Sequence, residues 1–257
     1  FVPSRGLGDV YKRQTIAATV EKISTITSVY KVPVNRITKD VEHITPQMLP
    51  LLEFNQEDID KVISNVGVDV SNIQDIYPLS PLQEGMFFHY LMNNQEKGDP
   101  YVSTSLLSFK DKEKRTNFIK ALQFVVNRHD VLRTCFINEG LPQAVQVVLR
   151  EVTLIVENLK IDASQDILSE LKLLIAPGNQ WMDVSKAPLL ELKSVDDPNN
   201  NTYYLIFNQH HLILDHVGLE KITSEVELYL LGQESSLSKP VLYLSLIHIS
   251  EPTRRYE

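Results

Sequence analysis

Cysteine occurs only once in this chain, at Cys135, and several other features that would define a class of protein are missing as well. A single thiol rules out an internal disulfide, and its mostly apolar surroundings favour a buried small side chain in a reducing compartment. No stretch reaches the roughly 18 consecutive apolar residues of a membrane span, and the N-terminus lacks the basic-then-apolar pattern of a signal peptide. We therefore predict a cytoplasmic protein without a membrane partner.

Clusters of basic residues are also absent, and the formal net charge is -8. Because nucleic-acid binding needs clustered Lys and Arg to neutralise phosphates, this pattern argues against a nucleic-acid partner. No glycine-rich loop indicates a nucleotide site, and no ligand spacing indicates a metal site. What the chain does have is 43% hydrophobic residues over 257 positions, which is ample for the core of one large domain or two small ones.

The most informative motif is a pair of histidines followed by an aspartate, which comes directly after the apolar segment 203–207. His210 and His211 stand where a strand is expected to end, and Asp215 follows four positions after the second histidine. A base at the end of a strand can be held rigidly beside a channel, which favours a catalytic site. Paired histidines near a carboxylate also occur as buried hydrogen-bonded groups or metal ligands, so this motif alone leaves the function open.

Two further motifs precede the histidines in order and at long separations: YPLSPLQEGM at 77–86 and RHDVLRT at 128–134. Together with HHLILDH they resemble the first three core motifs of the condensation domain of nonribosomal peptide synthetases, from about Ile44 to Tyr243. The resemblance implies an enzyme that joins an upstream peptidyl or aminoacyl thioester to the amine of a downstream aminoacyl thioester. It implies no directly bound cofactor, because upstream and downstream peptidyl carrier domains deliver both substrates on phosphopantetheine arms. An adenylation domain of the same synthetase is a further implied partner.

The resemblance assigns the catalytic role to His211, which either removes a proton from the amine or positions it. His210 supports the loop, and Asp215 orders it through an ion pair or backbone hydrogen bonds, with Arg133 or an arginine of a second lobe as candidate partner. His216 replaces the last glycine of the family's HHxxxDG pattern. This replacement predicts an ordinary backbone φ and a narrower or differently lined path for pantetheine. A third catalytic or metal-binding histidine at this position is the minor alternative.

For the two earlier motifs we predict structural roles: the first shapes the lobe and its carrier-protein face, and the second forms a helix-to-strand junction. The segment 88–91, followed by Gly98 and Asp99, partly resembles the extra histidine motif of dual epimerisation and condensation domains. Tyr90 stands where that motif has its second histidine, and dual activity is an alternative. A heterocyclisation domain would carry aspartates instead of the paired histidines and is disfavoured.

Strands and helices intermix without strict alternation, which predicts an α/β (α+β) two-layer sandwich rather than a barrel. The resemblance implies the N-terminal lobe of a chloramphenicol-acetyltransferase-like two-lobed fold, with the active site between the lobes and the second lobe missing. Helix signals follow Asn55, which acts as an N-cap for a helix ending at Gly67, and Ser80, with Pro81 at the first position. Further helices are expected over 118–126 and 166–174, and Leu219, Ile222, Val226 and Leu230 predict the apolar face of a last helix that ends at Gly232. Strands are expected over 101–109, 132–137, 144–149, 152–156, 189–195 and 203–207.

Both ends of the chain, 1–14 and 244–257, resemble translations of one sequencing-library adapter read in its two directions, and we expect neither to belong to the fold. Between them we predict an upstream tail and linker at 15–52 and the N-terminal lobe at 53–243. On this interpretation the chain is a fragment, amide formation belongs to its full-length parent, and the fragment itself is inactive. Two alternatives are an acyltransferase of the same superfamily acting on a small thioester, and a noncatalytic lobe that docks carrier proteins.

Overall fold

The computed structural model describes residues 35–93, 98–161, 166–176 and 178–240. The adapter-like ends, residues 15–34 of the expected linker and residues 241–243 of the expected lobe lie outside these described residues. The helices of the described part are α3 (Gln56–Val66), α4 (Pro81–Met92), α5 (Lys112–Arg128), α6 (Ile167–Leu174) and α7 (His216–Leu230). Its strands are β1 (Ile73–Pro78), β2 (Val102–Phe109), β3 (Thr134–Ile137), β4 (Val145–Leu149), β5 (Val156–Asn158), β6 (Leu190–Asp197) and β7 (Thr202–His210).

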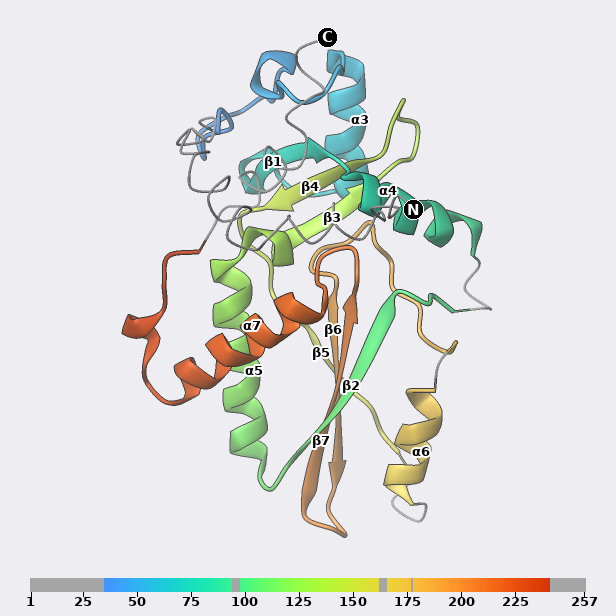
Figure 1. The fold of residues 1–257 in the computed structure, drawn as a ribbon, viewed down its shortest axis with the longest axis vertical. Helices are drawn as coiled ribbons and strands as arrows, with labels where there is room; N and C mark the ends of the chain where they lie inside the picture. The colour runs from blue at the N-terminus through green and yellow to red at the C-terminus, as the bar shows by residue number, and fades with distance from the viewer. Residues whose placement is uncertain (1–34, 94–97, 162–165, 177, 241–257) are drawn as a thin grey trace, which may run out of the picture. The chain divides into compact units, whose positions relative to one another are not determined.

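The strands form two sheets, which Figure 1 shows one above the other. The smaller sheet has the order β1-β4-β3 and is antiparallel throughout. The larger sheet has the order β2-β7-β6-β5, with a parallel pairing only between β5 and β6. In this sheet Val102 at the start of β2 lies opposite His210 at the end of β7. The register therefore places the histidine motif beside the segment that leads into β2.

Helices cover the sheets in layers, and apolar side chains fill the space between them. Helices α5 and α7 lie on one face of the larger sheet and α6 lies on the other (Figure 1). The first interface buries Leu122, Leu205 and Ile222 among others, and the second buries Leu171 and Ile206. A separate cluster joins α3 to the smaller sheet. This layering of helices on sheets confirms the predicted α/β fold class.

Local signals placed the first two helices correctly. Asn55 accepts a hydrogen bond from the backbone of Asp58, whose carboxylate accepts from Asn55 in return, and Gly67 ends α3 with a φ of 67°. Ser80 and Gln83 form the same reciprocal capping box at the start of α4. These caps satisfy backbone N–H groups that a helix start leaves unpaired, so the helix boundaries follow from a few adjacent residues.

Three details differ from the expectations. Strand β1 was not predicted, because it contains Asp75 and ends at Pro78, two residue types that are uncommon in strands. The strand predicted over 152–156 is wrong: β5 begins only at Val156, and Ile155 is 80% exposed. Leu230 was assigned to the buried face of α7 but is 48% exposed.

The described part of the expected linker packs against the smaller sheet. Ile37, Ile44, Leu49 and Leu52 are buried in the same apolar cluster as α3. The guanidinium of Arg150 holds this segment by donating a hydrogen bond to the backbone carbonyl of Ile37 at 2.7 Å. Residues 35–52 therefore contribute to the core, while the domain boundary at 53 stays a prediction.

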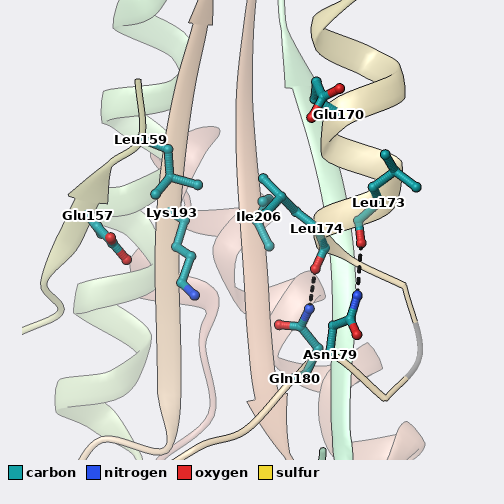
Figure 2. Close-up of a pocket in the computed structure, with 9 residues that line it drawn as sticks. All are labelled: Glu157, Leu159, Glu170, Leu173, Leu174, Asn179, Gln180, Lys193 and Ile206. Atoms are coloured by element: carbon teal, nitrogen blue, oxygen red, sulfur yellow. Dashed lines mark hydrogen bonds between the residues drawn. The ribbon is translucent and has the colours of Figure 1, made fainter. Parts of the chain in front are cut away.

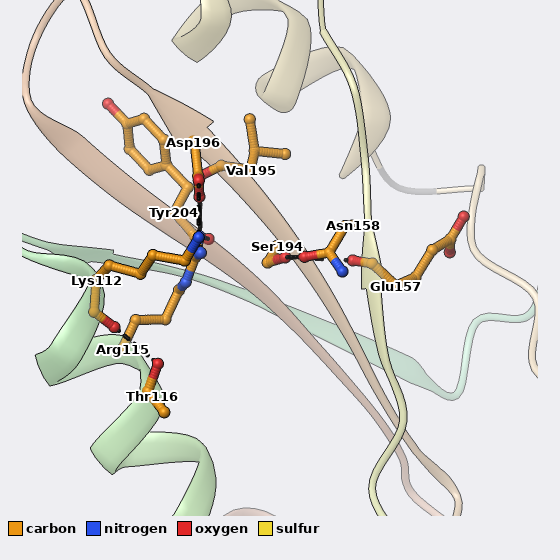
Figure 3. Close-up of polar contacts among 9 residues, drawn as sticks. All are labelled: Lys112, Arg115, Thr116, Glu157, Asn158, Ser194, Val195, Asp196 and Tyr204. Atoms are coloured by element: carbon orange, nitrogen blue, oxygen red, sulfur yellow. Dashed lines mark hydrogen bonds and ion pairs between the residues drawn. The ribbon is translucent and has the colours of Figure 1, made fainter.

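Arg115 anchors α5 to the larger sheet through a buried guanidinium (Figure 3). It donates to the carbonyl oxygens of Val195 and Tyr204 at 3.2 and 3.1 Å, and it lies 2.7 Å from a carboxylate oxygen of Asp196. One planar side chain thus satisfies three acceptors on two neighbouring strands, which fixes the position of the helix over the sheet.

Cys135 is fully buried in β3, and desolvation raises the pKa of its thiol to about 12. This burial confirms the prediction of a small buried side chain. A thiol with a raised pKa stays protonated and unreactive.

Within the ranges that the structure describes, no helix combines the length and the apolar content needed to cross a membrane.

Candidate active site

The paired histidines lie at the junction between β7 and α7. His210 is the last residue of β7, Asp215 is the N-cap of α7, and the helix begins at His216. The three residues between His211 and Asp215, Leu212, Ile213 and Leu214, are all buried in the core that α5, α7 and the larger sheet share. The buried side chains of this short loop fix the position of the histidines next to it.

His210 is a buried structural residue. Its side chain is 0% exposed, and its Nε2 lies 2.9 Å from a carboxylate oxygen of Asp99. The backbone N–H of Leu212 donates to Nδ1 at 3.0 Å, which places the ring proton on Nε2, where it is donated to Asp99. Both ring nitrogens therefore have a partner within the protein, and the supporting role of His210 stays a prediction.

His211 is half-buried, and its backbone and its ring are held by Tyr101 and Ser103. Its backbone N–H donates to the carbonyl of Tyr101 at 2.9 Å, which continues the pairing of β2 and β7 by one residue. Its Nε2 lies 3.0 Å from the hydroxyl oxygen of Ser103 on β2. A serine hydroxyl can donate to this nitrogen or accept from it, and in either case it restrains rotation of the ring. Sequence reasoning missed Ser103, because only the strand register brings it beside the histidine.

Asp215 orders the loop through a backbone hydrogen bond. Its carboxylate accepts from the N–H of Gly218 at 2.7 Å, as an N-cap does. The suggested ion pair with Arg133 is wrong: the guanidinium of that residue donates to the carbonyls of Leu149, Val126 and Asn127 and to the side chain of Gln74. Among the described residues Asp215 forms no ion pair, and its interaction is confined to its own helix.

His216 is an exposed residue at the start of α7. Its side chain is 84% exposed and pairs with Glu220 one helical turn later, at 3.2 Å. As the first residue of α7 it has no positive φ, which confirms the ordinary backbone expected from the loss of glycine. Within residues 35–93, 98–161, 166–176 and 178–240, no group of three or more His, Cys, Asp or Glu could hold a metal ion.

The first motif is joined to the histidine loop through Gln83. The side-chain amide of Gln83 donates to the carbonyl of Leu212 at 3.0 Å. The same amide forms a reciprocal pair with the buried Gln146, at 3.1 and 3.2 Å, and Gln146 also donates to the carbonyl of Pro78. The motif therefore shapes the lobe, as predicted, and it also fixes the backbone between the histidines and Asp215. Its part in a carrier-protein face stays a prediction.

The second motif is joined to α7 through Glu225. The carboxylate of this residue accepts from Arg128 at 3.1 Å and contacts Nε2 of His129 at 2.8 Å. Burial raises the pKa of Glu225, but the hydrogen bonds and charges of His129 and Arg128 outweigh it and leave the pKa lowered. Arg133 donates hydrogen bonds to carbonyls in the last turn of α5, as described above. These contacts confirm the predicted structural junction between helix and strand.

The segment that resembles a dual epimerisation motif lies around His210. Tyr90 stacks on Trp181 with ring centroids 4.7 Å apart and meets the ring of His210 edge-on. Asp99 binds His210 through its carboxylate. The backbone N–H of Asp99 donates to the carbonyl of Gln180 at 2.7 Å, which fixes the position of Asp99. The segment thus supports the first histidine, and dual activity stays a prediction.

Among the cavities of the described residues are two whose linings do not include the histidine motif. One, of about 390 Å³, lies beside α4 and is lined by Tyr90, Leu91 and Asp183 among others. The other, of about 320 Å³, lies where α6 meets the larger sheet (Figure 2). There Asn179 and Gln180 donate to the last carbonyls of α6.

The sequence of this chain matches the model of one protein family and is similar to the sequences of several synthetases. Residues 73–247 match the sequence model of the condensation domain. The chain is 38% identical to malpinin synthetase of Mortierella alpina over 239 residues, which is 93% of the chain and 3% of that protein. It is 32% identical to a linear gramicidin synthase of Brevibacillus parabrevis over 220 residues, or 84% of the chain and 4% of that protein. The chain therefore spans only a small part of these relatives.

Solved structures show the same fold at low identity. The crystal structure of holo T3CT matches with a TM-score of 0.62 and 16% identity, covering 81% of this chain and 46% of that one. The starter condensation domain of rhizomide synthetase RzmA matches with a TM-score of 0.52 and 17% identity, covering 69% of this chain and 45% of that one. These matches confirm the predicted chloramphenicol-acetyltransferase-like fold, and the chain spans less than half of each solved structure.

Proposed function

The chain belongs to the condensation-domain family, and we propose that as part of a larger synthetase it forms amide bonds between an upstream acyl thioester and the amine of a downstream aminoacyl thioester. The single observation that carries this proposal is the geometry of His211. Its ring is half-buried, restrained by Ser103 at 3.0 Å, and mounted on a loop whose next three side chains are in the core. An imidazole that is held in this way can meet an amine without reorganising the protein.

The proposed reaction begins with a neutral amine beside His211. The nitrogen lone pair forms the new C–N bond at the thioester carbonyl carbon, and the carbonyl π electrons move to oxygen. The imidazole of His211 accepts one proton from the nitrogen, which has become cationic. The C=O bond then reforms, the C–S bond breaks, and the departing thiolate takes the proton from the imidazolium. His210 and Asp215 do not touch the substrate in this scheme; they hold the loop through Asp99, Leu212 and Gly218.

The substrates and partners follow from the family. We propose that peptidyl carrier domains upstream and downstream deliver both thioesters on phosphopantetheine arms, and that an adenylation domain of the same synthetase loads the carrier. The arms are substrates in transit, and the chain itself needs no bound cofactor in this scheme.

For the domain organisation we propose that residues 53–243 are the N-terminal half of the condensation domain, supported by the packed segment 35–52. The solved relatives are more than twice as long as the part that this chain covers. On this proposal the 257-residue chain forms no amide alone, because a second lobe is needed to exclude water and to line the path of the acyl donor.

The test uses a hybrid domain in which residues 35–240 are joined to the remaining half of the matching condensation domain of malpinin synthetase, between two loaded carrier domains. We expect amide product from this hybrid and a loss of at least about 100-fold in rate for His211→Ala. His216→Ala is the matched control, since His216 is the exposed histidine of the same motif, and it should leave the rate within about two-fold.

The same hybrid separates the alternatives. Product formation that persists unchanged in His211→Ala would refute the catalytic assignment and leave a lobe that docks carrier proteins. Transfer to small free thiols or amines with no preference for carrier-bound acceptors would instead favour an acyltransferase of small thioesters.

A further inference from the structure

Gln209, the residue before the paired histidines, carries a buried oxygen without a partner. The residue is only 4% exposed, and its side-chain Oε1 has no hydrogen-bond partner among the described residues. Buried polar atoms are nearly always paired, so a buried unpaired oxygen requires an explanation. The site proposed above gives no role to Gln209.

The strand register places Gln209 next to the candidate active site. On β7 it lies directly opposite Ser103, so the two side chains point to the same face of the sheet. Ser103 is the residue whose hydroxyl contacts the ring of His211. On its other side Gln209 lies opposite Leu190, which belongs to the apolar core. Gln209 therefore lies between the residue that contacts the ring of His211 and a residue of the apolar core.

Other buried glutamines in the chain show what a structural glutamine looks like here. Gln146, which is fully buried, uses both ends of its amide, donating to Pro78 and exchanging hydrogen bonds with Gln83. Gln209 differs from it because its acceptor is left open. An acceptor kept unpaired beside a base is suited to a donor that arrives from outside the protein.

We propose that Oε1 of Gln209 accepts an N–H of the attacking amine and so selects primary amines as acyl acceptors, an inference that rests on the proposed function. When a primary amine attacks the thioester, its nitrogen becomes cationic and carries two protons. One proton passes to His211, and the other is held by Gln209, which is a neutral amide and takes no proton itself. A secondary amine has a single proton at this stage, so it cannot satisfy both residues.

The first test measures stability in the 257-residue chain. Gln209→Met removes the unpaired oxygen at similar volume and should raise the melting temperature by about 2–6 °C, because an unsatisfied buried acceptor is destabilising. Gln146→Met is the matched control and should lower the melting temperature, because it breaks satisfied hydrogen bonds. If Gln209→Met lowers the melting temperature as much as Gln146→Met does, the oxygen is satisfied within the protein and the proposal is overturned.

The second test measures specificity in the hybrid domain with glycyl and N-methylglycyl acceptors on the same carrier. The unchanged hybrid should prefer glycyl, and Gln209→Met should lower kcat/KM for glycyl about 10- to 100-fold while changing N-methylglycyl less than about three-fold. Gln209→Glu keeps an oxygen acceptor and should restore part of the glycyl rate. Equal losses for both acceptors, or no loss for glycyl, would overturn the proposal.

A hybrid that forms no amide at all refutes the proposed function, and the role of Gln209 is then decided separately. In the 257-residue chain, the side-chain amide signal of Gln209 is identified in NMR spectra by its absence in Gln209→Met. That signal should shift saturably with glycinamide and stay unchanged with methoxyacetamide, which has an ether in place of the amine. The same response to both probes would overturn the proposal.

Discussion

The side-chain amide of Gln83 donates a hydrogen bond to the backbone carbonyl of Leu212 at 3.0 Å, across 129 positions of sequence. One residue thereby caps α4, pairs with Gln146 in β4 and holds the loop that carries His211. The first and third motifs of the family are parts of one hydrogen-bonded unit in this chain. This relationship leads to the first of four predictions.

Gln83→Ala should lower the free energy of unfolding of the 257-residue chain by about 2–4 kcal/mol, because it removes a helix cap and leaves buried groups unpaired. Urea denaturation measures this change. Gln233→Ala alters an exposed glutamine and should stay within about 0.5 kcal/mol of the unchanged chain. A loss below this control value in Gln83→Ala would show that Leu212 does not depend on the contact.

Asp99→Ala should destabilise the chain by about 1–3 kcal/mol, because the buried Nε2–H of His210 and the backbone N–H of Tyr101 would both lose their acceptor. Asp99→Asn keeps one of the two acceptor oxygens and should cost less. Denaturation of the two variants in parallel measures the difference. If the asparagine variant were the less stable one, an acceptor oxygen alone would not account for the contribution of Asp99.

Ser103→Ala should lower kcat of the hybrid domain about 3- to 30-fold with little change in melting temperature, because the ring of His211 would lose its restraint. Ser103→Thr retains a hydroxyl and should recover most of the rate. Ser105→Ala is the control, since Ser105 lies on the same face of β2 but opposite Phe207. An equal loss in both alanine variants would assign the effect to the strand and not to the hydroxyl.

Asp75 should make stability depend on pH. Desolvation raises the pKa of this buried carboxyl to about 6, although hydrogen bonds from Tyr77 and Ile76 oppose the shift. Because the folded pKa lies above the unfolded value of about 3.9, the folded state binds the proton more tightly, and this stabilisation is lost as the pH rises from about 4 through 6. Above pH 6 the ionised carboxylate destabilises the fold by about 2–3 kcal/mol.

Asp75→Asn cannot ionise and can still accept from the backbone N–H of Ile76. Its stability relative to the unchanged chain should therefore increase between pH 4.5 and pH 7.5, as measured by denaturation at each pH. A constant difference across this range would mean that Asp75 titrates normally in the folded chain.

The parts of the fold that the sequence predicted are those encoded locally. The caps at Asn55 and Ser80 and the helices predicted over 118–126 and 166–174 depend on neighbouring residues, and α5 and α6 confirm these helices. Strand β1 was missed because its buried Asp75 is tolerated only through contacts such as the hydroxyl of Tyr77, which donates to the carboxylate at 2.7 Å. The start of β5 was misplaced for a related reason, since its pairing with β6 is set by residues that lie far away in sequence.

The candidate site likewise contains residues that the sequence predicted and residues that it did not. The histidine motif and Asp215 stand out in the sequence because their types and spacing are unusual. Ser103 and Gln209 carry no such signal: one is a serine in a serine-rich strand, and the other precedes the motif without belonging to it. The positions of both residues beside His211 depend on the register of β2 against β7, which no local sequence pattern specifies. The wrong pairing of Arg133 with Asp215 also came from matching charges without knowing which surfaces meet.

The burial of Leu212, Ile213 and Leu214 determines how this site can be transferred between proteins. Because these side chains interlock with α5, α7 and the larger sheet, a graft of the seven motif residues alone would import His211 without the packing that orients it. A recombinant synthetase must therefore exchange the whole core that surrounds the loop, with its crossover points in the exposed connections at its edges. The same interlocking implies that the amide of Leu212 exchanges with solvent only when the domain unfolds as a whole.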